Sequence, residues 1–180
     1  MIDNPAHSLP FAVALAVLMF LVGCQSNPNG QPSKFEAEPE KIEGRLSITG
    51  VRTNLSFSLQ RLTPDLQTLR VFGSMGLGEV SVVYVNGEPS EGRFEGKLLS
   101  AEQMQETLRS KTGLMVPLAV LPAWIEGRAD GRWPSLAFED GFEQLGWQIR
   151  RVLQTQTGMP RRTELTNGEL KIIIGVQRWQ

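Results

Sequence analysis

From Ile42 onward, apolar and polar residues alternate along the chain in short runs. A period of two places successive side chains on opposite faces of a strand, so each run predicts a strand with one buried face. The runs form two groups, separated by a segment between residues 100 and 127 with helical features. An order of strands, helices and strands favours a mainly β fold with antiparallel strands over a parallel sheet. The alternating residues are Leu46 and Ile48; Leu55, Phe57 and Leu59; Leu69 and Val71; Val80 and Val82; Leu145, Trp147 and Ile149; and Leu170, Ile172, Ile174 and Val176.

Two Asn-Gly pairs mark the sharpest turns expected between these strands. This pair is favoured in two-residue β-hairpin turns, because both residues accept positive φ. Asn86-Gly87 predicts a hairpin with residues 93–97 as its short return strand. Asn167-Gly168 predicts a second hairpin near the C-terminus. Both turns make consecutive strands antiparallel neighbours.

The segment between the two groups of strands predicts one helix followed by two shorter helical pieces. Ser100 and Gln103 have the spacing of a capping box, and Gly113 is a natural C-cap. In the apolar segment 116–127, Pro122 interrupts a continuous helix. We therefore expect two short helical pieces there.

The N-terminal region contains an unbroken apolar run at residues 11–22. A membrane-spanning helix needs about 20 apolar residues, so this run fits the core of a secretory signal peptide better. It leads into Leu21-Val22-Gly23-Cys24, which resembles the lipobox of bacterial lipoproteins. The resemblance implies cleavage before Cys24 and lipidation of Cys24, including a palmitate-type acyl chain. Gln25 in place of Asp favours the outer membrane. We expect a signal peptide at 1–23, a lipidated flexible tether at 24–41 and a folded domain at 42–180.

Composition excludes several classes of function. The chain has 18 Lys and Arg, 19 Asp and Glu, and one His. Residues 1–23 include His7 and Asp3 but no Lys or Arg, so the mature chain has 18 residues of each charge. A nucleic-acid partner is therefore not expected. With Cys24 lipidated and no His, Ser–His catalysis, Cys–His catalysis and Cys–His metal sites are unavailable. We expect no enzyme activity, metal or cofactor.

An ordered set of motifs resembles the LolB family of outer-membrane lipoproteins. The family fold implies an unclosed antiparallel β-barrel, with short helices as a lid over an apolar cavity. The implied function is protein transport by a monomeric receptor. It takes acylated lipoproteins from a periplasmic LolA-like carrier and inserts them into the lipid of the outer membrane, without a nucleotide. The motifs are GRLSI from Gly44, SMGLGEV from Ser74, TGLMVPLAVLPAWIEG from Thr112, Gly146-Trp147, Met159-Pro160 and Trp179.

The resemblance and the alternation together nominate site residues. The family's cavity Trp positions match Trp124, Trp147 and Trp179, whereas Leu59 stands where a further Trp is common. The family's exposed membrane-insertion residue matches Met75, with Leu77 two positions on. We expect the acyl cavity to be lined by Leu46, Ile48, Leu55, Phe57, Leu59, Trp124, Trp147, Ile172 and Ile174.

Alternatives remain open at this stage. A lipoprotein with a similar half-barrel would bind another lipid or amphiphile, and a structural lipoprotein of envelope assembly would have a filled core. A cavity separates the receptor and the other lipid-binding lipoprotein from the structural one, and close packing with no pocket beyond about 300 Å³ would count against a ligand role. Binding of a carrier separates the receptor from the other lipid-binding lipoprotein. Met75 either projects from its loop or packs back on the barrel. Arg150-Arg151 and Arg161-Arg162 are either solvated charges or an interface with the carrier.

Overall fold

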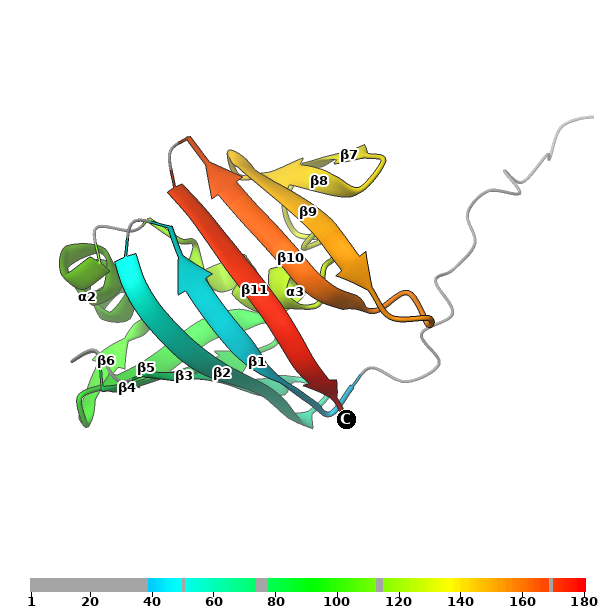
Figure 1. Ribbon diagram of the computed structural model, residues 1–180. Coiled ribbons are helices and arrows are strands. Elements are labelled where there is room, and N and C mark those ends of the chain that lie inside the picture. Colours follow the sequence, from blue (N-terminus) through cyan, green and yellow to red (C-terminus); the bar gives the residue numbers. More distant parts are fainter. Residues whose placement is uncertain (1–38, 50, 74–77, 113–114, 169) are drawn as a thin grey trace, which may run out of the picture. The chain divides into compact units, whose positions relative to one another are not determined.

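Eleven antiparallel strands form one sheet in the computed structural model, which describes residues 39–180 except 50, 74–77, 113–114 and 169 (Figure 1). The strand order is β6-β5-β4-β3-β2-β1-β11-β10-β9-β8-β7, so the first and last strands are neighbours at the centre of the sheet. There the Lys41 N–H donates to the Gln180 carbonyl at 3.0 Å. The strands are β1 (Lys41–Ile48), β2 (Val51–Thr63), β3 (Leu66–Gly73), β4 (Glu79–Val85), β5 (Glu88–Phe94), β6 (Lys97–Ser100), β7 (Ser135–Phe138), β8 (Gly141–Gln144), β9 (Trp147–Gln154), β10 (Pro160–Asn167) and β11 (Leu170–Trp179).

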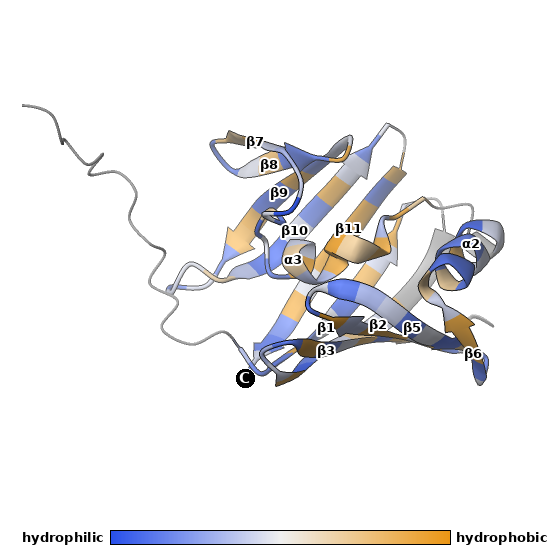
Figure 2. Ribbon diagram, turned by 180° about the vertical axis from the view of Figure 1, so that it is seen from behind, coloured by the Kyte–Doolittle hydropathy of each residue, from blue (hydrophilic) through white to orange (hydrophobic). Residues whose placement is uncertain are grey.

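The barrel formed by this sheet is unclosed. β6 and β7 are its two edges and do not pair with each other in the described part of the chain. Between them in sequence come α2 (Ala101–Thr112), the 3₁₀ helix η2 (Leu118–Val120) and α3 (Leu121–Ile125). η2 and α3 cover the inner face of the sheet, and α2 packs beside β5 and β6 (Figure 2). The predicted mainly β, unclosed antiparallel barrel with short covering helices is confirmed.

None of the helices among the described residues has the length and apolar character needed to cross a membrane.

The core lies between the inner face of the sheet and the covering helices. The predicted alternation is confirmed in β2, where Leu55, Phe57 and Leu59 are buried and the residues between them are half-buried. In β11, Ile172, Ile174 and Val176 are buried on the same face. Because the inner side chains are almost all apolar, burial of this face supplies the main driving force for folding.

The hairpin at Asn86-Gly87 is confirmed, but its return strand is not at residues 93–97. Asn86 and Gly87 have φ of 53° and 78°, and β5 begins immediately after them. Glu95 and Gly96, with φ of 50° and 79°, form a further two-residue turn inside the segment predicted as a strand. The prediction failed because Glu95 occupies a left-handed position that usually takes Asn, Asp or Gly.

Two further turns differ from the prediction. Leu145 is not an inward strand residue: with a φ of 52° it forms the β8–β9 turn with Gly146 and is exposed. The C-terminal hairpin is present, but its turn is shifted by one residue, because Asn167 pairs with Leu170 as the last rung of the ladder. Gly168 has the positive φ expected of it.

The helical segment follows the prediction closely. The Gln103 N–H donates to Ser100 Oγ at 3.3 Å, and the Ser100 N–H donates to Gln103 Oε1 at 3.0 Å, which confirms the capping box of α2. η2 and α3 are the two short pieces expected next. Pro122 is accommodated in the first turn of α3, where a missing N–H costs little. Gly113 lies outside the described residues.

Gly44 permits a close approach at the centre of the sheet. A Cβ at this position would lie 2.2 Å from the Gly175 carbonyl oxygen and 2.6 Å from Cε1 of Phe57. The Phe57 ring, itself buried, thus packs directly over the backbone of β1. A bulge in the β1–β11 pairing begins between Glu43 and Gly44.

We predict that Gly44→Ala lowers the free energy of unfolding by about 2 kcal/mol, because both neighbouring groups must move to accept the methyl group. Gly131→Ala is the matched control, since a Cβ there meets nothing within 4 Å. Urea denaturation followed by tryptophan fluorescence measures both. Equal stability of the two variants would contradict this account of Gly44.

Candidate functional site: an aliphatic pocket under the covering helices

An apolar pocket lies between the sheet and its cover. β1, β2, β3, β4, β10 and β11 form its floor, and α2, η2, α3 and Val116 form its roof. Its volume is about 140 Å³, and apart from Gly78 every described side chain that lines it is Leu, Ile or Val. The lining residues are Leu46, Ile48, Leu55, Leu69, Val71, Gly78, Val80, Val82, Leu108, Val116, Leu118, Leu121, Ile125, Leu165, Ile172 and Ile174.

Five of the nine nominated cavity residues lie together around this pocket. They come from three neighbouring strands at the centre of the sheet, β1, β2 and β11. Leu55 and Ile174 are buried, and Ile48 is half-buried. The five residues are Leu46, Ile48, Leu55, Ile172 and Ile174.

The other four nominated residues lie in the packed core and are not among the residues that line the pocket. Phe57 and Leu59 are buried farther along β2. Trp124 of α3 and Trp147 of β9 are also buried, and their ring centroids are 6.0 Å apart at an interplanar angle of 51°. Trp179, the third matched tryptophan, is half-buried against the same core.

The remaining nominated positions cannot be placed at the pocket. Cys24, Met75 and Leu77 lie outside the described residues. Gly78, the first described residue after Gly73, lines the pocket.

The roof segment is anchored by side chains rather than by a strand partner. The Tyr84 hydroxyl of β4 donates to the Leu118 carbonyl at 3.0 Å, and Gln105 Oε1 of α2 accepts from the Leu118 N–H at 3.1 Å. The Gln105 amide also donates to the Val116 carbonyl at 2.9 Å. Burial raises the pKa of the Tyr84 hydroxyl well above its ordinary value, so this group stays a neutral donor.

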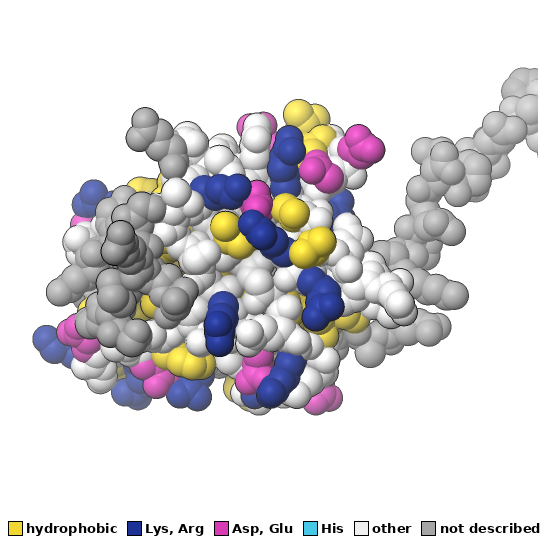
Figure 3. Space-filling model, in the orientation of Figure 1, with side chains coloured by type: hydrophobic (Ala, Val, Ile, Leu, Met, Phe, Trp, Pro, Cys, Tyr) yellow, Lys and Arg dark blue, Asp and Glu magenta, His cyan; other side chains and the backbone are white. Residues whose placement is uncertain are grey.

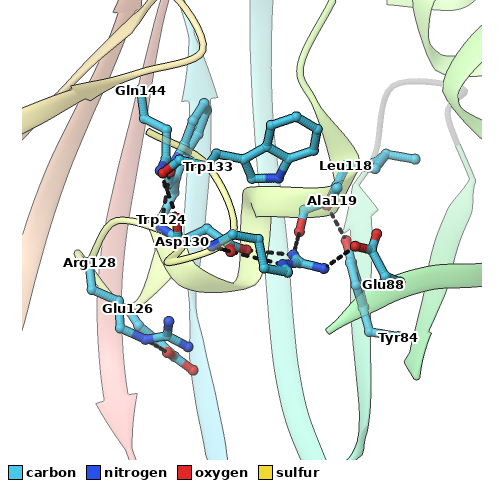
Figure 4. A network of polar contacts seen from close by, with 11 residues as sticks. Tyr84, Glu88, Leu118, Ala119, Trp124, Glu126, Arg128, Asp130, Trp133 and Gln144 are labelled. Carbon is cyan, nitrogen blue, oxygen red and sulfur yellow. Dashed lines mark hydrogen bonds and ion pairs between the residues drawn. The ribbon is translucent and has the colours of Figure 1, made fainter. Parts of the chain in front are cut away.

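Gln144 organises the wall behind α3 (Figure 4). Its Oε1 accepts from Trp124 Nε1 and from the Asp130 N–H, both at 3.0 Å. Its Nε2 donates to the Asp130 carbonyl at 2.8 Å and to the Trp133 carbonyl at 3.0 Å. The amide, 1% exposed, thereby uses both donors and both acceptor positions. It thereby links α3, which forms part of the roof, to the loop of residues 130–133.

Arg132 joins three separate parts of the chain in the same network. Its guanidinium donates to Asp130 Oδ1 at 2.8 Å and to the Ala119 carbonyl of η2 at 2.8 Å, and it forms an ion pair with Glu88 at the start of β5. The hydrogen bond from Arg132 is the main cause that lowers the pKa of the Asp130 carboxyl below its usual range. Asp130 is therefore ionised at neutral pH, and the contact persists there.

The chemistry of the pocket is that of an apolar solvent. The described lining offers no charged side chain, hydroxyl or amide to a ligand. Among the described residues there is no group of three or more His, Cys, Asp or Glu side chains placed to hold a metal ion. A cavity of about 150 Å³ is large enough for a benzene-sized group, so the pocket in its observed form has room for no more than the end of one hydrocarbon chain. Binding there would come from desolvation of CH₂ groups alone.

Sequence reasoning missed the residues that hold the roof. Tyr84 follows Val80 and Val82 on the buried face of β4, and its position as the sole Tyr on an apolar stripe was an available signal. Gln144 likewise shares the buried face of β8 with Phe142. A polar residue on an apolar face indicates a buried hydrogen bond but not its partner. Arg132 carried no such signal.

Comparison with known proteins adds a family to this geometry. Residues 40–179 match the family model described as "Outer membrane lipoprotein LolB". Three relatives are each named "Outer-membrane lipoprotein LolB". That from Neisseria meningitidis serogroup A is 28% identical, over 89% of this chain and 86% of its own length. The proteins from Shewanella loihica and Chromohalobacter salexigens are 25% and 27% identical, each over 93% of this chain and over 86% and 89% of their own lengths.

We predict that Gln144→Leu lowers the free energy of unfolding by about 3 kcal/mol. The substitution leaves the Trp124 indole N–H and the Asp130 N–H buried without their acceptor, and the Asp130 carbonyl keeps only its bond from the Trp133 N–H. Gln148→Leu is the control, because Gln148 is exposed on the neighbouring strand β9. Thermal unfolding by near-UV circular dichroism measures both. A loss for Gln144→Leu no larger than for Gln148→Leu would show that the network contributes little.

Proposed function

The chain belongs to the LolB family of outer-membrane lipoproteins, and on that premise we propose that it receives acylated lipoproteins from a periplasmic LolA-like carrier and inserts them into the outer membrane. The observation that carries this proposal is the wholly aliphatic pocket beneath the covering helices. A lipoprotein's acyl chains expose tens of CH₂ groups, each worth about 0.8 kcal/mol when buried. Release into water is therefore prohibitive, and an apolar site must shield the chains between carrier and membrane.

The observed pocket is the resting form in this proposal. At about 140 Å³ it is smaller than one acyl chain and below the size usual for a ligand site. Loading thus requires the roof to move away from the sheet. The roof is suited to this because its hydrogen bonds to Tyr84, Gln105 and Arg132 involve single side chains, whereas a β-ladder would have to break as a unit. Bringing acyl chains under the roof offsets the lost contacts.

Attachment to the membrane in this proposal is through Cys24. The lipid on Cys24 holds the protein at the periplasmic face of the outer membrane, and the segment 24–41 links it to the domain that begins near Ile42. The chain acts as a monomer in this proposal. Transfer involves no bond making or breaking, so the function needs neither a catalytic residue nor a cofactor.

Delivery in this proposal uses the segment between β3 and β4. Gly73, Gly76 and Gly78 permit a tight tip that presents Met75 and Leu77. Two large apolar side chains at a tip suit insertion into lipid. Gly78, which follows this tip in the sequence, lines the pocket, so insertion there would direct cargo from the pocket toward the bilayer.

A second candidate is a lipoprotein that holds a different amphiphile, and the small resting volume of the pocket is compatible with it. The two functions differ in the source of the ligand. Transfer of an acylated lipoprotein from a purified carrier supports the receptor function. Failure of transfer, with retention of a co-purifying glycolipid, would support the alternative.

We predict that Val71→Phe reduces cargo acceptance from the carrier at least fivefold. Val71 is half-buried and lines the pocket, so the larger ring occupies the volume that acyl chains need. Val83→Phe is the control, since Val83 is half-buried on the opposite, outward face of β4. Acceptance is measured by pull-down of labelled lipoprotein, with thermal melting to check folding. Undiminished transfer by a folded Val71→Phe variant would remove the pocket from the mechanism.

We predict that the native protein begins at Cys24 and is acylated there. Mass spectrometry of the N-terminal peptide from membranes should show the mass of the attached lipid. Cys24→Ala in the full chain should block processing, because the modified thiol is absent. An unmodified thiol at Cys24 in native membranes would contradict the anchor.

We predict that Met75→Glu leaves cargo acceptance nearly unchanged but blocks delivery to liposomes. A charged side chain opposes insertion into lipid, whereas burial of one large apolar side chain favours it by about 1.5–3 kcal/mol. Met115→Glu is the matched control, because Met115, shortly before the start of η2, is 61% exposed. Fluorescent cargo is followed from carrier to protein and from protein to liposome. Delivery at the parental rate would make Met75 an ordinary loop residue.

A further inference from the structure

Positive charge gathers on the outer face of the central strands, opposite the pocket. Figure 3 shows Lys and Arg side chains spread over this face, with few Asp or Glu between them. The chain as a whole has a net charge of −1, so the charge is segregated rather than in excess. We name this surface the outer basic face and define it by Lys41 and Arg45 of β1, Arg161 and Arg162 of β10, and Lys171 and Arg178 of β11.

The acidic side chains on this face do not neutralise it. Glu43 lies 2.7 Å from Lys41 and 3.5 Å from Arg178, so one carboxylate is shared by two cations. Glu164 is shared in the same way by Arg162 at 2.8 Å and by Lys171 of β11 at 2.7 Å. Each of the two groups keeps one positive charge.

Two arginines on the face form no ion pair within the described part of the chain. Arg45 and Arg161 are exposed and lie on an open groove of about 630 Å³, together with Leu153 and Ile173. Each group around a carboxylate contributes one positive charge, and Arg45 and Arg161 contribute one each. The face therefore has a net charge of plus four. A surface of this charge attracts anions from beyond direct contact.

Aliphatic side chains are interspersed with these cations. Leu153, which lies on the groove, is 57% exposed, and Val152 beside it in β9 is 46% exposed. Gly175 of β11 also lies on the groove, and a Cβ there would meet only the Arg45 carbonyl oxygen, at 3.9 Å. The groove therefore offers guanidinium groups next to solvent-exposed hydrocarbon. Phosphate headgroups above acyl chains present the same pair of chemistries.

We propose that the outer basic face docks on a phospholipid bilayer by binding the phosphate groups of anionic lipids. A bilayer is favoured over an acidic protein because β1, the first strand of the face, begins at Lys41, where the preceding segment joins the fold. If that segment is the lipidated tether, which rests on the proposed function, its roughly 18 residues span about 24 Å as a flexible coil. The anchor then holds the face within reach of headgroups. Docking there is separate from insertion of Met75.

The test measures how close the outer basic face lies to the lipid headgroups in the lipid-anchored mature protein. A fluorophore is attached at Ser47→Cys, on the groove, or at Ser110→Cys, exposed on α2. The protein is anchored in vesicles of phosphatidylcholine with or without phosphatidylglycerol, and quenching by headgroup spin-labelled lipid is measured. We expect at least threefold stronger quenching at Ser47 than at Ser110 when phosphatidylglycerol is present, and a loss of the difference in high salt.

Variants link the result to the two arginines without ion pairs. Each basic residue near an anionic surface contributes about a fivefold factor, so Arg45→Gln with Arg161→Gln should reduce docking about 25-fold and abolish the excess quenching. Arg93→Gln with Lys97→Gln is the matched control, because both residues are exposed on β5 and β6. That pair should leave quenching at Ser47 unchanged.

Equal quenching at the two probes would overturn the proposal. So would insensitivity of the Ser47 probe to phosphatidylglycerol, or persistence of the excess quenching in the arginine variant. Shielding of the Ser47 probe only after the purified carrier is added would assign the face to a protein and also overturn it. Cargo transfer on the same vesicles keeps the two proposals apart. Transfer without excess quenching contradicts the docking face alone, and excess quenching without transfer contradicts the receptor function alone.

Discussion

The cover over the open side of the sheet is held by side-chain hydrogen bonds to its backbone, and the pocket depends on this arrangement. Tyr84, Gln105 and Arg132 reach the 116–120 segment from a strand, a helix and a loop. Gln144 holds Trp124 of α3 through a bond between side chains, because its Oε1 accepts from the indole Nε1. These contacts satisfy buried polar groups while the lining of the pocket stays aliphatic. The cover is thus held above the sheet, and space remains below it.

Local sequence patterns predicted the elements of the fold well. Leu55, Phe57 and Leu59 have the alternation of a half-buried strand, and Ser100 with Gln103 has the spacing of a capping box. Asn86-Gly87 fixes one hairpin because both residue types readily adopt the positive φ that a two-residue turn requires. Glu95-Gly96 and Leu145-Gly146 make turns with the same signs of φ, but Glu and Leu seldom adopt these conformations, and the tight pairing of the flanking strands imposes them.

The site was harder to predict than the fold, because alternation gives the face of a residue but not its depth. Leu55 and Leu59 lie on the same face of β2, yet only Leu55 lines the pocket. That difference depends on where the roof segment crosses the sheet, which is fixed by contacts between residues distant in sequence, such as Tyr84 and Leu118. The charged outer face is a similar case, since the cations of β1, β10 and β11 become neighbours only because β11 pairs with both β1 and β10.

The central claim is that acyl chains of a transported lipoprotein enter the space beneath the cover. A photoreactive amino acid at Leu108, which lines the pocket from α2, tests this during transfer from the carrier, with the same group at Leu62, 53% exposed on β2, for comparison. Cross-linked cargo should form at Leu108 and not at Leu62, and mass spectrometry should place the bond on an acyl chain. Cross-linking at neither position while transfer proceeds, or bonds only to the polypeptide of the cargo, would contradict the account.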